Sequence, residues 1–453
     1  MRRERSFAIL LVAAAALGAY IYFVERKRPA SDAPETRPKV FAGVESEKIE
    51  EIVVSTGGNT TTLRKSGDRW RIVSPIAEQA DQSEASSIAT NLATLEQAEV
   101  VEENASDLKR FGLDPPKMEV AFRTAGDKTL RRLQIGEKTA TGGELYARLP
   151  DSRRVFLIAG YLDTTFNRTT FDLRDKALLR FDRDKADLFE VTADGRTVRA
   201  MRQGGDWKLT APIEARADFG TIEGLVSRLG SSQMKALVTK DGETPSPADL
   251  KRWGLDPPAV VVRVGTGSAQ ASLAVGAKDK DGNYYARDLS RPAVFTIEPS
   301  LVDDLRKPAA EFRRKDVFDF RSFSATRAEA TYRGRTYVLE RVKNPKKEAP
   351  TTEIWRQTAP EAKDLDQAKA DSMLSAFSNL RVQSWVDKVD GLGAPEVTLA
   401  VRFDEGKKQE KVVFAKRGDE VYASRGDEPG FAKVDATDYG SAIRALNELL
   451  GLK

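Results

Sequence analysis

The chain has 453 residues, 40% hydrophobic and 31% charged, and its 73 lysines and arginines against 69 aspartates and glutamates leave a net charge of +4. That length predicts about three domains, and the interspersed signs of charge argue against a face for nucleic acid. The chain has no cysteine and no histidine, which excludes disulfides, thiol nucleophiles, imidazole bases and the commonest zinc sites.

The first 24 residues read as a cytoplasmic tip and a membrane anchor. An uncharged run of 18 residues extends from Phe7 to Val24, which is just long enough to cross a bilayer as a helix. Aromatic residues end the run and arginines lie on both sides of it, as is typical of membrane interfaces. We expect an uncleaved transmembrane helix over 7–24. A cleaved signal peptide is the alternative, although no clear cleavage site follows.

Residues 25–43 predict a tether. Pro29, Pro34 and Pro38 alternate with charges of both signs, and proline-rich segments of this kind are extended and semi-rigid. No packed element is expected before residue 44.

The first repeat, residues 44–182, opens with a predicted antiparallel meander. Short β-rich runs at 49–55, 60–65 and 70–73 are separated by glycine-containing turns. A helix should follow, because Asp81 stands at an N-cap position and Glu84 has the spacing that completes a capping box.

The motif Phe111-Gly112-Leu113-Asp114-Pro115-Pro116 comes next. Gly112 can adopt the left-handed conformation that ends a helical turn, and the proline pair then favours an extended exit. Four further short strands are expected, near 118–124, 129–135, 144–149 and 153–158, followed by a helical segment.

The same order of features recurs twice. Residues 183–321 carry a second motif at Trp253–Pro258, and residues 322–453 carry a degenerate one at Gly391–Pro395. Trp70, Trp207 and Trp355 mark the period, at intervals of 137 and 148 residues. Those are domain-sized periods, so each repeat should close its own core.

The recurring residues have structural explanations as well as functional ones. The three tryptophans are more typical of core anchors than of a ligand platform. Helix capping explains Asp81, Asp218 and Asp366 better than catalysis does. Gly136 and Gly276, each followed two residues later by lysine, indicate hairpin turns rather than phosphate-binding loops.

Four residues form a tentative ligand or partner surface. Tyr146 and Arg148 recur as Tyr285 and Arg287 in the second repeat, each pair separated by alanine. A repeated pocket for an acidic ligand is one interpretation, and the alternation of strand faces is the other.

The tryptophan entry, the Ala-Asp helix start, the Gly-Leu-Asp-Pro-Pro motif, the Ile-Gly-x-Lys strand and the Tyr-Ala-Arg triplet together resemble the bacterial "domain of unknown function 4340" family. The resemblance covers nearly everything after the tether, strongly in the first two repeats and weakly in the third. It implies an envelope-anchored protein, often encoded beside gliding-motility-type ABC transporter components, and it supplies no catalytic residues.

The sequence therefore predicts an α+β protein in which an N-terminal transmembrane helix precedes three tandem repeats of antiparallel meanders and short helices. We expect it in the bacterial inner membrane as a single-pass protein with its repeats in the periplasm. The expected role is non-enzymatic, as an accessory or scaffolding subunit of an ABC-type transport or export system. A periplasmic binding module for glycan or another envelope polymer is the alternative. No catalytic, metal or cofactor-binding residue is assigned.

Overall fold

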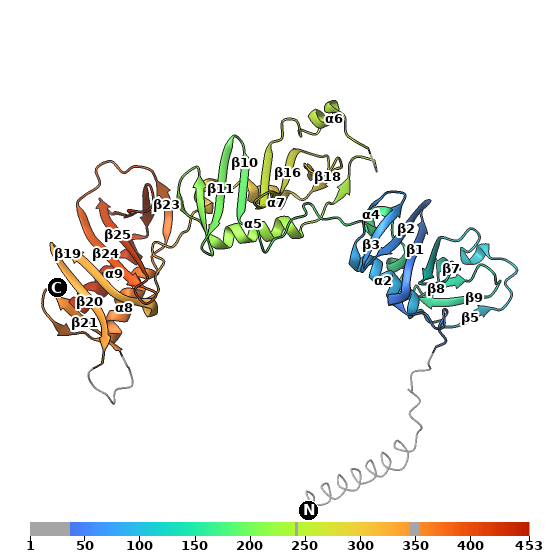
Figure 1. The fold of residues 1–453 in the computed structure, drawn as a ribbon, viewed down its shortest axis with the longest axis horizontal. Coiled ribbons are helices and arrows are strands. Elements are labelled where there is room, and N and C mark those ends of the chain that lie inside the picture. Colours follow the sequence, from blue (N-terminus) through green and yellow to red (C-terminus); the bar gives the residue numbers. More distant parts are fainter. Residues whose placement is uncertain (1–36, 241–242, 345–352, 453) are drawn as a thin grey trace, which may run out of the picture. The chain divides into compact units, whose positions relative to one another are not determined.

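The structure, a computed structural model, describes residues 37–240, 243–344 and 353–452. The predicted anchor at 7–24 and most of the predicted tether lie outside these residues. Among the residues described, no helix is long and apolar enough to span a membrane. The chain divides into two compact units, an N-terminal unit that ends at Asp175 and a C-terminal unit that begins at Lys176 (Figure 1).

The N-terminal unit holds repeat 1, a nine-stranded antiparallel sheet in the order β4-β3-β2-β1-β6-β7-β8-β9-β5. Two meanders meet where β1 pairs with β6, and β5 returns to the edge beside β9. The strands are β1 (Ile49–Thr56), β2 (Asn59–Ser66), β3 (Arg69–Ser74), β4 (Glu78–Gln79), β5 (Val100–Glu102), β6 (Met118–Thr124), β7 (Arg131–Lys138), β8 (Glu144–Arg148) and β9 (Val155–Ala159). The helices are α2 (Gln82–Ala93), α3 (Leu162–Phe166) and α4 (Thr170–Leu173), with short 3₁₀ turns η2 (Ser46–Lys48) and η3 (Lys109–Phe111).

Repeat 2 opens the C-terminal unit and has the same strand order, β13-β12-β11-β10-β15-β16-β17-β18-β14. Its strands are β10 (Leu188–Ala193), β11 (Arg196–Gln203), β12 (Asp206–Ala211), β13 (Ala215–Arg216), β14 (Ala236–Leu237), β15 (Val260–Thr266), β16 (Ala269–Lys278), β17 (Tyr284–Asp288) and β18 (Val294–Ile297). Its helices are α5 (Phe219–Ser231), α6 (Pro247–Arg252), α7 (Pro299–Leu305) and the 3₁₀ turn η4 (Ala309–Phe312).

Repeat 3 repeats the order again as β22-β21-β20-β19-β24-β25-β26-β27-β23. Its strands are β19 (Ala325–Tyr332), β20 (Arg335–Lys343), β21 (Glu353–Ala359), β22 (Lys363–Asp364), β23 (Val382–Val386), β24 (Pro395–Phe403), β25 (Lys408–Arg417), β26 (Glu420–Arg425) and β27 (Phe431–Val434). Its helices are α8 (Gln367–Ser378), α9 (Ala436–Leu450) and the 3₁₀ turn η5 (Ser322–Ser324). Three sheets with one topology confirm the prediction of three tandem α+β repeats.

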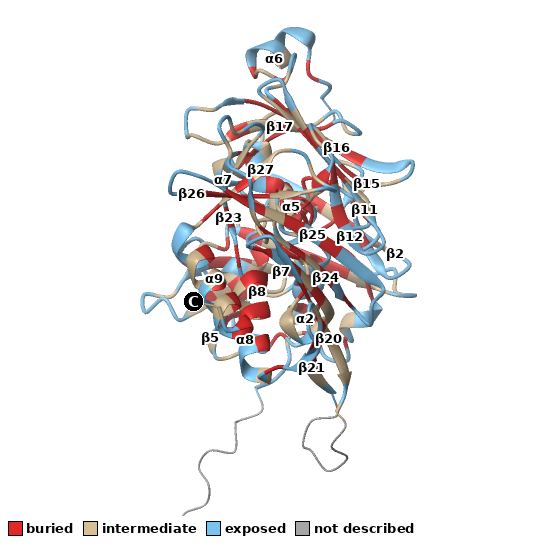
Figure 2. Cartoon of the chain, turned by 90° about the vertical axis from the view of Figure 1, so that its left-hand side faces the viewer, coloured by how far each residue is buried: buried red, intermediate tan, exposed pale blue. Residues whose placement is uncertain are grey.

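Each core lies between one face of the sheet and its helices. In repeat 1, α2 contributes Ile88 and Leu92 to the core, and the sheet contributes alternate residues of β2 and β3. Figure 2 shows buried residues in red along the strands and on α8. The core of repeat 3 also takes in Phe318 and Phe320, which precede residue 322.

The tryptophan and aspartate predictions are confirmed. Trp70, Trp207 and Trp355 are each only 2% exposed. The N-cap carboxylates of α2, α5 and α8 each accept a hydrogen bond from a backbone N–H of the first turn; these residues are Asp81, Asp218 and Asp366.

The capping box predicted at α2 is wrong in its second half. Glu84 does not reach back to Asp81, because the N–H of Asp81 already donates to the carbonyl of Leu173 at 2.9 Å. The carboxylate of Glu84 pairs instead with Arg168, at 2.9 Å.

The end of the predicted tether packs against repeat 1. Phe41 is 7% exposed and its ring lies edge-on to Phe122, with ring centres 4.9 Å apart. The N–H of Val40 donates to the carbonyl of Leu95 at 2.9 Å. The expectation of no packed element before residue 44 is therefore wrong for these residues, because an apolar Val-Phe pair follows the last proline.

Candidate functional site

The glycine of each Ile/Val-Gly-x-Lys segment lies inside a strand, which corrects the prediction of hairpin turns. Gly136 is in β7 and Gly276 is in β16, each at an irregularity in the pairing with the next strand. A Cβ at either position would collide with a backbone carbonyl, that of Phe111 or that of Trp253. The two repeated motifs are therefore in backbone contact, and only glycine fits there.

In repeat 1 the tentative surface residues pack against the Gly-Leu-Asp-Pro-Pro motif. The ring of Tyr146 lies 4.9 Å from that of Phe111, in a small satellite cluster of apolar residues. The guanidinium of Arg148 donates to the carbonyls of Pro150 and Ser152, at 3.4 and 3.2 Å. Both side chains thus have partners within their own repeat.

Repeat 2 reproduces this arrangement. Tyr285 packs on Trp253 with ring centres 5.9 Å apart. Arg287 donates from Nε to the carbonyl of Arg291 at 3.1 Å. The structure thus joins each tyrosine to its motif aromatic and each arginine to the following turn. A ligand surface on these four residues stays a prediction.

Sequence reasoning missed the third copy of the triplet. Tyr422 and Ala423 stand in β26 where the other repeats have Tyr-Ala, and Ser424 takes the place of the arginine. The Tyr422 hydroxyl donates to Glu420 at 2.8 Å. The pairing of Ala423 with Phe414, as Ala286 pairs with Val275, fixes this alignment.

Repeats 2 and 3 meet at a set of buried charges. Glu428, in the loop between β26 and β27, has a side chain only 4% exposed, and its carboxylate pairs with the guanidinium groups of both Arg216 and Arg313. Burial lowers the pKa of Arg313, and the hydrogen bond that Arg313 donates to Glu428 opposes that shift. The Arg313 guanidinium also lies over Trp385, 3.3 Å from the ring centre.

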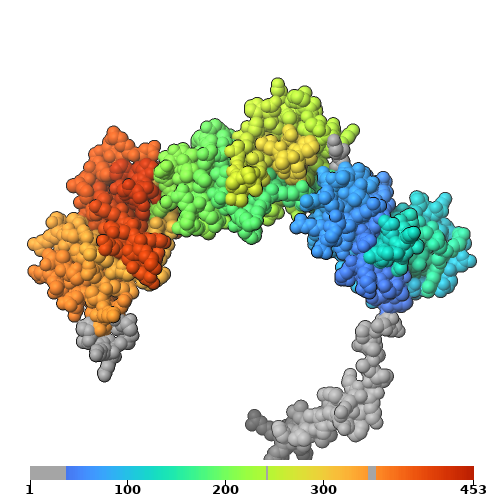
Figure 3. Space-filling view, viewed as in Figure 1, coloured from blue at the N-terminus to red at the C-terminus, as the bar shows by residue number. Residues whose placement is uncertain are grey.

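A second buried ion pair, between β25 and β26, contacts Val317 and Phe320, which precede repeat 3. Arg425 and Glu410 are 2.6 Å apart, with side chains 7% and 3% exposed. Arg425 also donates to the carbonyl of Val317 at 3.0 Å, and Glu410 accepts from the N–H of Phe320 at 2.8 Å. Figure 3 shows repeat 2, in green and yellow, beside repeat 3, in orange and red. The junction cluster consists of Arg216, Arg313, Glu410, Arg425 and Glu428.

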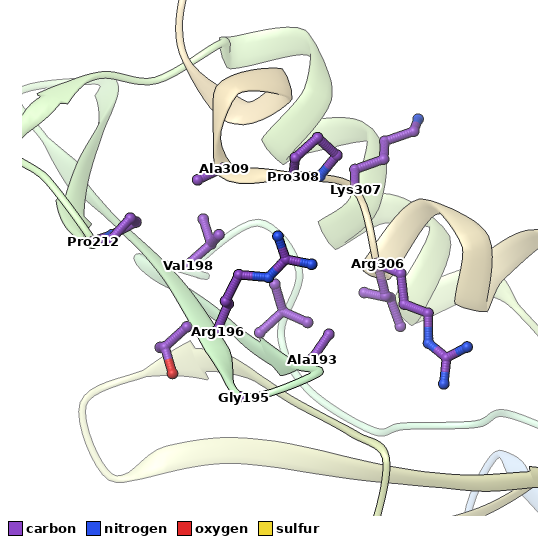
Figure 4. Close-up of a pocket in the computed structure, with 12 residues that line it drawn as sticks. Ala193, Gly195, Arg196, Val198, Pro212, Arg306, Lys307, Pro308 and Ala309 are labelled. Carbon is purple, nitrogen blue, oxygen red and sulfur yellow. The ribbon is translucent and has the colours of Figure 1, made fainter. Parts of the chain in front are cut away.

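A cavity of about 340 Å³ opens in repeat 2 between the β10–β11 hairpin and the loop from α7 to η4. Apolar side chains of Val191, Val198 and Leu305 form part of its wall, and they are all buried. Its charged lining residues are cationic: Arg196 from the hairpin, and Arg306 and Lys307 from the loop. Figure 4 shows the guanidinium of Arg196 directed toward Pro308 and Ala309, with the heads of Arg306 and Lys307 turned away from it.

The same place in repeat 1 is closed by hydrogen bonds between side chains. The hydroxyl of Thr56 donates to Asn167 at 2.6 Å, and Thr61 is hydrogen-bonded to Thr170 at 2.7 Å. The pairing of the two hairpins aligns Thr56 with Ala193 and Thr61 with Val198. The equivalent bridges of Arg174 and Arg313 align the loops, so that Asn167 corresponds to Arg306 and Thr170 to Ala309.

Repeat 3 has bulky residues at the two hairpin positions. Tyr332 and Tyr337 correspond to Ala193 and Val198, and they are 4% and 7% exposed. Repeat 2 therefore combines two small residues, Ala193 and Ala309, with the cationic lining, which makes its cavity the candidate functional site. Within the ranges that the structure describes, no group of three or more histidine, cysteine, aspartate or glutamate residues could hold a metal ion.

One family model, described as a domain of unknown function (DUF4340), matches residues 70–206 and 207–400. Each match begins at one of the period-marking tryptophans. No curated protein matches the sequence. Two structures of the DNA polymerase sliding clamp from Pseudomonas aeruginosa are 8% and 9% identical and cover 86% and 87% of this chain and 91% and 93% of theirs. Their TM-scores are 0.17 and 0.18, which are too low to indicate a shared fold.

Proposed function

We propose, from the premise that this chain belongs to the DUF4340 family, that it acts by association rather than by turnover. In this proposal it is an accessory or scaffolding subunit of an ABC-type transport or export system. Residues 7–24 hold it in the bacterial inner membrane and the repeats lie in the periplasm. The choice of transporter subunits as partners rests on the family resemblance.

The observation that carries the proposal is the junction cluster. Burying charges costs desolvation energy, and apolar residues of similar volume often stabilise a protein at least as well. What paired and hydrogen-bonded charges supply is a directional contact, because a planar guanidinium binds a carboxylate in few relative orientations. Arg216 and Arg313 reach Glu428 across more than a hundred residues. A scaffold needs domains held in a fixed relative position, because its partners bind surface groups that must keep their spacing.

The recurring aspartates support the same proposal. Asp218 and Asp366 cap helices, so helix capping explains why these aspartates recur. Tandem repeats also multiply surface, and specific complexes bury on the order of 800 Å² per partner.

Co-purification in mild detergent tests the proposal. The tagged full-length chain should recover membrane transporter subunits. The variant Glu428→Gln, which removes one charge from the junction cluster, should recover less of them while remaining in the membrane fraction. The proposal fails if the full-length chain elutes alone and a purified 37–453 fragment turns over an envelope polymer.

A further inference from the structure

We propose that the cavity of repeat 2 binds a small organic anion, namely a phosphate or carboxylate group carried on a short apolar body. This inference is independent of the scaffolding role.

The charge of the lining selects an anion. No carboxylate lies among the lining residues, whereas Arg196, Arg306 and Lys307 are all cationic. Lys307 already forms a salt bridge with Asp304, at 2.7 Å. The guanidinium of Arg306 lies over the ring of Tyr284, 5.5 Å from its centre. Arg196 is exposed and has no side-chain hydrogen bond or ion pair with any residue that the structure describes. Its planar fork of donors is therefore available for a bidentate contact with phosphate or carboxylate.

The remaining wall selects an apolar body. Val191, Val198, Leu305 and Ala309 face the same space as Arg196. The volume of about 340 Å³ is at the lower end of ligand pockets, and burial of each methylene there favours binding. A free inorganic anion would leave this apolar surface uncovered.

Comparison among the repeats shows that the space is particular to repeat 2. Repeat 1 spans it with the Thr61–Thr170 hydrogen bond, and repeat 3 has buried Tyr332 and Tyr337 at the hairpin positions. The residue that corresponds to Arg196 in repeat 1 is Asn59, so the cation and the open volume occur together in repeat 2. Repeat 3 keeps an exposed arginine, Arg335, at the same hairpin position. Arg335 therefore provides a matched control.

Chemical footprinting of the full-length chain tests the site. Phenylglyoxal modifies accessible arginines, and peptide mass spectrometry measures the rate at Arg196 and at Arg335 separately. We expect saturating n-butyl phosphate or butyrate to slow modification of Arg196 about tenfold, as a charge-assisted contact of ordinary strength would. Arg335 should be unaffected. Butanol should protect neither residue, and inorganic phosphate should need a concentration about tenfold higher or more.

Two variants separate charge from volume. Ala193→Tyr copies repeat 3 and keeps Arg196, and it should abolish the protection of Arg196. Saturation-transfer NMR on the methyl signals of n-butyl phosphate should show binding weakened about tenfold in Arg196→Gln and unchanged in Arg335→Gln. The proposal is overturned if both glutamine variants behave alike, if butanol protects as well as butyl phosphate, or if Ala193→Tyr leaves protection intact.

Discussion

A Cβ on Gly276 would collide with the backbone carbonyl oxygen of Trp253, the residue that opens the second Gly-Leu-Asp-Pro-Pro motif. The next residue, Ala277, donates its N–H to that same carbonyl at 2.8 Å. The strand and the motif thus cross backbone to backbone, and the cluster of Trp253 and Tyr285 forms beside the crossing. Gly136 and Phe111 make the same contact in repeat 1.

Gly276→Ala should destabilise the C-terminal unit by about 1–3 kcal/mol, because the methyl group has no space and the strand must shift. Gly224→Ala is the control: Gly224 is exposed in α5 with no atom within 4 Å of its Cβ position. It should stabilise the helix by about 0.5–1 kcal/mol. Denaturant unfolding measures both. Equal effects of the two substitutions would contradict the crossing.

Glu428→Ala should cost about 3–5 kcal/mol, since it leaves Arg216 and Arg313 buried without their shared carboxylate. The control is Asp390→Ala, because Asp390 pairs with Lys388 and the two side chains are 82% and 81% exposed; an exposed ion pair contributes about 1 kcal/mol or less. Calorimetry should resolve separate transitions for repeats 2 and 3 in Glu428→Ala only. A single undivided transition at the wild-type temperature would show that the cluster does not join them.

Acid should weaken repeat 3 through Glu420. Hydrogen bonds from Lys433, Tyr422 and Arg417 lower the pKa of Glu420 from 4.5 to about 2. A carboxyl group whose pKa is depressed in the folded state stabilises above its unfolded pKa, and that contribution is lost as the pH falls toward 2. Glu420→Gln should therefore flatten the pH dependence of the melting temperature between about 4.5 and 2. The exposed Glu361→Gln serves as control, and an unchanged slope in Glu420→Gln would refute the prediction.

Trp207→Ala should destabilise repeat 2 by about 3–5 kcal/mol, because it empties a site where the side chain is 2% exposed. The indole N–H also donates to Glu223 at 2.6 Å, and that hydrogen bond is lost. The N-terminal unit is separate and should keep its own transition. An unchanged melting curve together with loss of ligand binding would instead favour the platform interpretation of the tryptophans.

Local patterns were enough to predict most elements of repeat 1, although the short strands β4 and β5 were not predicted. The strand expected at 118–124 is β6, and Asp81, Asp218 and Asp366 cap helices. These features depend on residues a few positions apart, so the sequence displays them directly. Because the motifs recur, the elements predicted for the first repeat could be assigned to the matching segments of the other two.

Features that depend on distant segments were not predictable in this way. Gly136 looks like a turn residue because the carbonyl that requires glycine there belongs to Phe111, far away in sequence. The junction cluster joins residue 216 to residue 428. The cavity depends on which hairpin residue faces which loop residue, as with Val198 and Ala309, and that correspondence becomes visible only when the sheets are superposed in register.

The central claim is that this protein works in a complex, and the mass of the extracted particle tests it most directly. The chain alone has a mass of 50.0 kDa. Light scattering of the tagged full-length protein, extracted from its own membranes in mild detergent and corrected for bound detergent, should give a protein mass well above that of one chain. Mass spectrometry should then identify transporter subunits in the particle. A particle containing a single chain and nothing else would contradict the account.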